Sequence, residues 1–149
     1  RNYGGDTNDT MPDYYPRTLP KDAYKLWDFE SWTPDVVVIN LGTNDFSNRD
    51  LDTDAFVLAY SKLINFIRGN YSGTHIFCAA GPMDHRAKDY LVKIVKDMNK
   101  QGDKKVYFIE FPIMDGKTEG VGGSSHPSVK THLRVGKQLA DEIRAKLGW

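Results

Sequence analysis

The chain has 149 residues, of which 40% are hydrophobic and 27% are charged, and its 20 acidic and 20 basic side chains cancel. This length suits one domain, so we treat residues 1–149 as one unit, and the composition is that of a globular protein rather than a disordered or membrane-embedded one. No global field would attract nucleic acid or an anionic membrane, and no apolar run is long enough to span a bilayer. We therefore expect neither partner.

Residues 1–34 contain prolines at positions 12, 16, 20 and 34 and offer no convincing strand. The chain opens with RNYGGDTND, without an initiator Met or a signal peptide. We expect that a segment upstream of this opening has been removed.

From Asp35 onward, strand-like and helix-like patterns alternate. The runs DVVVINL, THIFCAA and KKVYFIEF predict three strands, at residues 35–41, 74–80 and 104–111. Helical spacing of apolar residues predicts three helices, the first capped by Thr53 and the third beginning at about Ser128. Their expected apolar faces are Phe56, Tyr60, Leu63 and Ile67; Leu91, Ile94, Val95 and Met98; and Val129, Leu133, Gly136, Leu139, Ile143 and Leu147.

Uninterrupted apolar strands that alternate with amphipathic helices are typical of a parallel sheet covered on both faces. We therefore predict an α/β fold, a three-layer α/β/α sandwich with an open parallel sheet. Three strands make a thin sheet whose first strand would present an unpaired apolar edge. The fold is thus expected to be incomplete at its N-terminal side. The single cysteine, Cys78, is expected to be a buried strand thiol.

Ligands of open α/β sheets bind beyond the carboxyl ends of the strands. After the first strand, Gly42 lets the backbone bend in the turn GTND, and the amide of Asn44 could stabilise a developing oxyanion. A plain strand-ending turn is the alternative, since Gly, Asn and Asp favour turns. After the second strand, His85 is either a surface residue in the first turn of a helix or a substrate contact, and Met83 is either core filler or an apolar wall for a ligand.

The third loop, FPIMDGKTEGVGGSSHPS, is long and glycine-rich and ends with His126 before Pro127. Long loops in compact domains are usually functional. His126 is either a solvated loop histidine or, facing the loop that carries Asn44, a general base for a hydroxyl nucleophile. The four histidines lack the spacing of a zinc site, so we expect no metal and no cofactor.

The stretches VVVINLGTNDFS and HPSVKTHLRVGKQLADEI resemble blocks III and V of the SGNH (GDSL-type) hydrolases, whose fold is flavodoxin-like. The similarity is closest to carbohydrate esterase family 2, acetyl esterases that act on plant cell-wall polysaccharides. The opening, RNYGGDTNDTMPDYYPRTL, also resembles the segment that in this family directly follows the glycine of block II.

The resemblance implies that Asn44 is the block III donor of the oxyanion hole and His126 the catalytic base. In such enzymes the other donors are backbone N–H groups of the nucleophilic Ser and of the block II Gly. Tyr3 falls where the family places an aromatic near the active site. Met83 and His85 fall in a loop that in relatives contributes a substrate-facing aromatic.

Two features depart from the family pattern. There is no Gly-Asp-Ser block, because the serines at positions 31, 47, 61, 72, 124, 125 and 128 lack Gly-Asp before them. Block V usually has an Asp three positions before the His, where this chain has Gly123. A backbone carbonyl, of Ser124 or Ser125, is expected to orient the imidazole, as is thought for some family 2 members; the competing hypothesis is that Asp115 or Glu119 folds back to reach it.

The chain therefore resembles the C-terminal portion of an SGNH domain from a secreted bacterial acetyl esterase that deacetylates xylan or a related glycan by a Ser-His mechanism. The partner expected is an acetylated oligo- or polysaccharide. The Ser would lie on an N-terminal segment that is either missing from this chain or carried by a separate companion chain. An inactive carbohydrate-binding module and an SGNH esterase or lipase acting on a non-sugar ester remain as alternatives.

Overall fold

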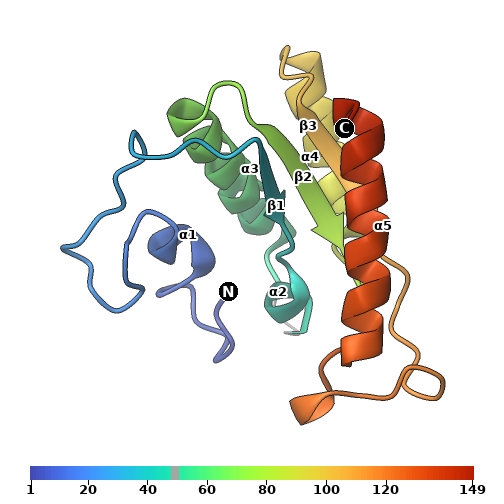
Figure 1. Cartoon of the computed structure of the whole chain (residues 1–149). Helices are drawn as coiled ribbons and strands as arrows, with labels where there is room; N and C mark the ends of the chain where they lie inside the picture. Colours follow the sequence, from blue (N-terminus) through green and yellow to red (C-terminus); the bar gives the residue numbers. More distant parts are fainter. Residues whose placement is uncertain (48–50) are drawn as a thin grey trace.

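The computed structural model describes residues 1–47 and 51–149 and has three parallel strands in one sheet (Figure 1). The strands are ordered β1, β2, β3, and their bounds are Val36–Ile39, His75–Ala80 and Val106–Glu110. In the register, Val37 pairs with Ile76, which pairs in turn with Val106. All three strands lie inside the runs predicted from the sequence.

Three long helices cover the sheet, two on one face and one on the other (Figure 1). Helices α3 and α4 share a face, whereas α5 lies alone on the opposite one; their bounds are Thr53–Asn70, Lys88–Lys100 and Val129–Leu147. Short helical segments complete the chain: α1 (Met11–Tyr14), α2 (Thr43–Ser47) and η1 (Gly123–Ser125). The predicted α/β/α architecture is confirmed.

The larger core lies between the sheet and the pair α3 and α4. The apolar faces predicted for these helices are buried there, with Val95 half-buried. Cys78 is buried in β2, where loss of hydration raises the pKa of its thiol to about 12. It is therefore an inert strand thiol, as expected.

Two details of the helices differ from the prediction. The N-cap of α3 is Asp52, whose carboxylate accepts a hydrogen bond from the Ala55 amide (2.9 Å), and not Thr53. Asp52 lies one position before the predicted cap and binds one of the backbone amides that are free at the start of the helix. The N-cap of α5 is Ser128, as predicted.

The buried face of α5 is also rotated from the predicted one. Val129 and Leu133 are 75% and 69% exposed, and Gly136 is exposed too. The residues that pack on the sheet are Val135, Leu139, Ile143 and Leu147. The first half of the predicted stripe therefore has no partner among the described residues, because α5 is the single helix on this face.

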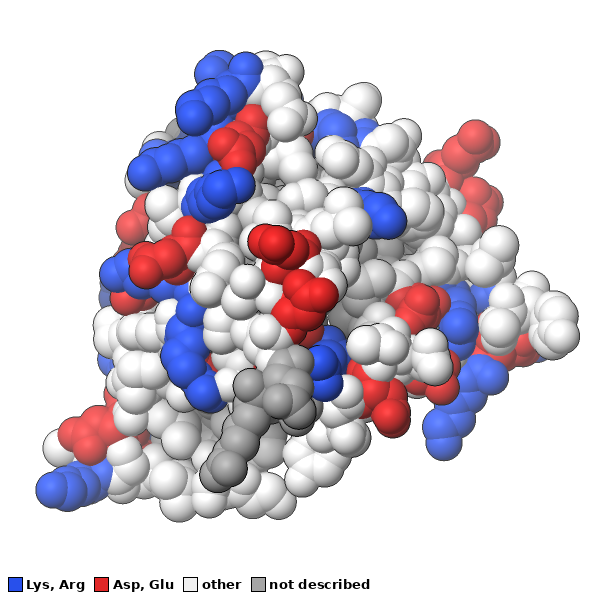
Figure 2. All heavy atoms as spheres, turned by 180° about the vertical axis from the view of Figure 1, so that it is seen from behind, with Lys and Arg blue, Asp and Glu red and all other residues white. Residues whose placement is uncertain are grey.

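Strand β1 forms one edge of the sheet, and among the described residues it pairs with β2 only. Residues 1–34 wrap over the α3 side and add the short helix α1 but no strand, as predicted (Figure 1). In the described part of the chain, no helix combines the length and apolar character that a membrane span requires. Seen from behind, acidic and basic side chains are interspersed over the surface (Figure 2).

Candidate functional site

Helix α2 presents Asn44 at the carboxyl end of β1. The backbone turns at Gly42, where φ is +124° and an added Cβ would lie 3.0 Å from the Cβ of Ala87. The Phe46 amide then donates to the Gly42 carbonyl (2.9 Å). GTND is therefore the start of a short helix rather than a tight turn, and Asn44 is exposed in its first turn.

Apolar packing holds α2 in place. Phe46 is buried, with its ring centroid 5.1 Å from that of Phe56 and 5.5 Å from that of Tyr90. Asn40, which the sequence did not single out, donates from its side-chain amide to the Gly81 carbonyl (2.9 Å). This bond ties the loop after β1 to the loop after β2, so the position of Asn44 is fixed from two sides.

The loop after β2 is tied to the end of β3 by His85. Its Nε2 lies 2.6 Å from the Phe111 carbonyl oxygen, and its Nδ1 lies 3.3 Å from a carboxylate oxygen of Glu110. Lys88 also binds Glu110 (2.6 Å). Because α4 begins at Lys88, His85 precedes the helix instead of lying in its first turn. Its ring faces protein groups, whereas Met83 in the same loop is partly exposed.

The loop after β3 presents His126 beside two backbone carbonyls. Its Nδ1 lies 3.1 Å from the Ser124 oxygen and 3.2 Å from the Gly123 oxygen. Carbonyl oxygens only accept, so a neutral ring in this setting carries its proton on Nδ1 and has a free lone pair on Nε2. This geometry is that of a general base whose orientation comes from the backbone.

The backbone that supplies these carbonyls is in an uncommon conformation. Ser124 and Ser125 have φ values of 52° and 60°, in the left-handed region that non-glycine residues rarely adopt. The turn is closed by hydrogen bonds from the His126 amide to the Gly123 carbonyl (3.1 Å) and from the Gly122 amide to the His126 carbonyl (2.8 Å). Strain of this kind persists only where surrounding contacts impose it.

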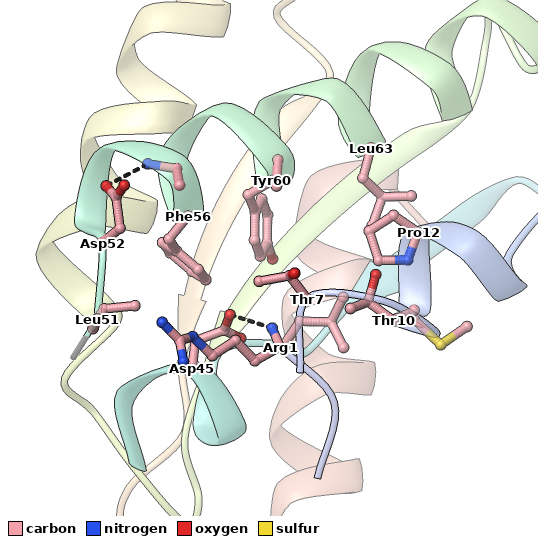
Figure 3. A pocket seen from close by; sticks show the side chains of 14 residues that line it. Arg1, Thr7, Thr10, Pro12, Asp45, Leu51, Asp52, Phe56, Tyr60 and Leu63 are labelled. Atoms are coloured by element: carbon pink, nitrogen blue, oxygen red, sulfur yellow. Dashed lines mark hydrogen bonds and ion pairs between the residues drawn. The ribbon is translucent and has the colours of Figure 1, made fainter. Parts of the chain in front are cut away.

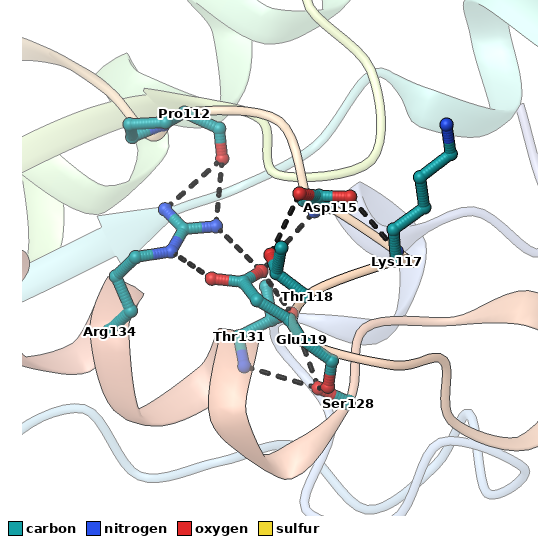
Figure 4. Close-up of polar contacts among 8 residues, drawn as sticks. All are labelled: Pro112, Asp115, Lys117, Thr118, Glu119, Ser128, Thr131 and Arg134. Carbon is teal, nitrogen blue, oxygen red and sulfur yellow. Dashed lines mark hydrogen bonds and ion pairs between the residues drawn. The ribbon is translucent and has the colours of Figure 1, made fainter.

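The two acids of this loop bind other groups (Figure 4). Asp115 accepts from the hydroxyl of Thr118 (2.7 Å) and from the Lys117 amide (2.9 Å). Glu119 accepts from Thr131 (2.7 Å) and forms an ion pair with Arg134. Hydrogen bonds from Arg134 and Thr131 lower the pKa of Glu119 to about 2. The carbonyls beside the imidazole Nδ1 are those of Ser124, one of the two serines that the sequence indicated, and of Gly123, which it did not indicate.

The N-terminal segment borders a cavity of about 450 Å³ against α3 (Figure 3). Asp45 of α2 and Arg1 line this cavity, and Tyr60 and Leu63 of α3 form its apolar wall. Tyr3 is 93% exposed and, like Asn44 and His126, does not line this cavity.

Helix α2, which contains Asn44, and the loop after β3, which contains His126, lie at the same end of the sheet, the carboxyl end of the strands (Figure 1). Within residues 1–47 and 51–149, no three His, Cys, Asp or Glu side chains are grouped so that they could hold a metal ion. An imidazole can transfer a proton and a side-chain amide can donate to a developing negative charge, which are the roles that the sequence predicts for His126 and Asn44.

Residues 2–139 match the model of a protein family described as GDSL-like Lipase/Acylhydrolase. The chain is 48% identical over 153 residues to the cellulase/esterase CelE of Acetivibrio thermocellus, an alignment that covers 99% of this chain and 19% of CelE. It is 24% identical to an acetylxylan esterase / glucomannan deacetylase of Cellvibrio japonicus, with 100% of this chain and 42% of that protein covered.

Solved structures agree with these relatives. A family two carbohydrate esterase from Clostridium thermocellum, in complex with cellohexaose, superposes with a TM-score of 0.93 at 47% identity and covers 99% of this chain. A family 2 enzyme from Corynascus thermopiles gives 0.81 at 34% identity over 97% of this chain. The chain spans 46% and 47% of these two structures, so it corresponds to less than half of either.

Proposed function

The chain belongs to the family of GDSL-like lipases and acylhydrolases, and from this premise we propose that it supplies the base and one oxyanion donor of a carbohydrate esterase. The proposed reaction removes O-acetyl groups from plant cell-wall polysaccharide of the acetylxylan type. The observation that carries the proposal is the contact of the His126 Nδ1 with two backbone carbonyls, because it leaves Nε2 free as a base.

In the proposed mechanism, Nε2 of His126 takes the proton of a serine hydroxyl as its oxygen attacks the acetyl carbonyl. The amide of Asn44 donates to the negative oxygen of the tetrahedral intermediate. The imidazolium then gives its proton to the departing sugar oxygen, and an acetyl-serine ester remains. Water, activated by the same imidazole, attacks this ester and releases acetate. The carbonyls of Gly123 and Ser124 accept from Nδ1 throughout and stabilise the imidazolium.

The serine is proposed to lie on an N-terminal segment, either preceding this chain or on a companion chain. The free edge of β1 supports this placement, because a strand added there in parallel would end at the sheet edge where Asn44 lies. Val129 and Leu133 are exposed apolar residues of α5. They offer a packing surface for a helix of this N-terminal segment on the face of the sheet that α5 covers.

The substrate class is inferred from relatives. The solved family two esterase binds cellohexaose, and another relative is named acetylxylan esterase / glucomannan deacetylase. The absence of a net charge suits a neutral polymer. Since such a polymer is too large to enter a cell intact, we place the parent protein outside the cell, as a secreted bacterial enzyme.

The test is acetate release from acetylated xylan by the full-length protein, together with hydrolysis of aryl acetate and aryl octanoate. We expect acetate to be the preferred acyl group and His126→Ala to abolish release. A protein that binds the glycan without releasing acetate would instead be an inactive carbohydrate-binding module. Faster cleavage of octanoate would assign the site to a lipid or another non-sugar ester.

A further inference from the structure

We propose that Glu119 is a positioning residue for His126. Together with Thr131 and Arg134 of α5, its carboxylate holds the loop that carries the imidazole, where relatives of this family usually hold the ring itself with an acid. This inference rests on the proposed role of His126 as the base. It assigns a function to a side chain that does not touch the ring.

Both carboxylate oxygens of Glu119 bind α5, and one of them also accepts from the Asp115 amide of the loop itself (3.3 Å) (Figure 4). One oxygen accepts from the hydroxyl of Thr131 (2.7 Å) and from Nη2 of Arg134 (3.0 Å), and the other accepts from Nε of Arg134. Such a two-point contact fixes orientation as well as distance. Thr131 is 0% exposed, so this carboxylate satisfies a hydroxyl that water does not reach.

The first turns of α5 and its N-cap also hold the backbone of the loop, at its beginning and in its middle. The guanidinium of Arg134 reaches the Pro112 carbonyl from both Nη atoms (3.4 Å each), directly after β3. The hydroxyl of Ser128 donates to the backbone carbonyl of Glu119 (2.7 Å) and accepts from the Thr131 amide (3.3 Å). The beginning and the middle of the loop are therefore attached to α5, into which its end continues directly.

A short, closed backbone segment connects Glu119 to His126. Val121 and Pro127 form an antiparallel bridge, and the Gly122 amide donates to the His126 carbonyl. A Cβ added at Gly122 would lie 2.8 Å from the Pro127 carbonyl oxygen, so the two backbone segments on either side of this turn are in close contact. A shift of Glu119 relative to α5 is thus passed to the imidazole as a rigid displacement.

Apolar packing does not hold this loop in place, because no residue from 112 to 127 is buried. The strained backbone of Ser124 and Ser125 needs external contacts to persist. The Met114 amide donates to the Pro82 carbonyl (2.9 Å), and the contacts described above attach the rest of the loop to α5. Catalysis is sensitive to such placement, since a displacement of about 1 Å can lower a rate about 100-fold.

The test compares Glu119→Gln and Thr131→Val with Asp115→Asn in the full-length protein. Asp115→Asn neutralises a carboxylate of the same loop and keeps an acceptor oxygen for one of its two partners, the Lys117 amide or the Thr118 hydroxyl. We expect kcat per folded molecule to fall about 10- to 100-fold in Glu119→Gln with KM within twofold. Thr131→Val should lower kcat in the same direction, and Asp115→Asn should stay within threefold.

A second readout needs no activity. Trypsin should cut Glu119→Gln at Lys117 of the loop about tenfold faster than the wild type, with cutting at Lys104, in the exposed turn before β3, unchanged. Cleavage at Lys117 at the wild-type rate, or a kcat within twofold of the wild type, would overturn the positioning role. Failure of the proposed esterase function is recognised separately, because the wild type itself would then release no acetate.

Discussion

The two segments that carry the candidate catalytic groups, helix α2 and the loop after β3, are held by different kinds of contact. Asn44 stands on a short helix whose Phe46 is buried among aromatic rings, so apolar packing places it. His126 stands on a loop without a buried residue between 112 and 127, placed by an ion pair, hydroxyls and backbone carbonyls. The comparison teaches that one site can combine a support that is insensitive to pH with one that depends on ionisation.

The largest effect should come from removing the base itself. His126→Ala in the full-length enzyme should lower kcat by about 10⁴-fold or more, as loss of a triad member does in serine hydrolases. Because His126 is exposed, we expect its loss to leave the melting temperature nearly unchanged. His132→Ala, an exposed histidine on α5, is the matched control. An active His126→Ala enzyme would remove this loop from the mechanism.

Among changes to the apolar packing that holds α2, Phe46→Ala should have the largest effect. Truncation of a buried phenylalanine typically lowers the free energy of unfolding by about 3–5 kcal/mol, because a cavity replaces its contacts. Urea unfolding followed by circular dichroism measures this loss, with Phe66→Ala, a partly exposed ring on α3, as the comparison. A loss below about 1 kcal/mol would show that α2 does not depend on this anchor.

Asn44→Ala tests the donor that this anchor presents. The side chain meets negative charge only in the transition state, so kcat should fall about 10²- to 10³-fold while KM changes little. Steady-state hydrolysis of an aryl acetate gives both constants. A fall of less than threefold would exclude Asn44 from the oxyanion hole.

The smallest expected effect is that of low pH, which should weaken the polar contacts that hold the His126 loop before the apolar contacts that hold α2. The pKa of Glu119 is lowered from 4.5 to about 2 in the folded chain, so its stabilising contribution is complete above about pH 4.5 and is lost as the pH falls toward 2. Hydrogen exchange, corrected for its intrinsic pH dependence, should show residues 112–127 opening over this range before residues 42–47. Equal opening of both segments, or an unchanged profile in Glu119→Gln, would contradict the difference between them.

Local patterns were sufficient to predict several parts of this protein. Apolar runs located all three strands, helical spacing located α3 and α4 with their buried faces, and Ser128 marked the start of α5. The GTND and HPS motifs follow the first and third predicted strands, so the sequence placed Asn44 and His126 at one edge of the sheet. These features depend on residues within one or two turns of each other, and the alternation of strands and helices then dictates a parallel sheet.

Other features depend on segments distant in sequence, and only the tertiary structure decided them. Glu119 binds Arg134, 15 positions away, and His85 contacts the Phe111 carbonyl across 26 positions. The exposure of Val129 and Leu133 depends on what lies beside α5, which its own periodicity cannot indicate. A sequence pattern determines which side chains share a face, but the partner of that face is set by packing between elements, and so the tie between Glu119 and α5 could be found only in the folded chain.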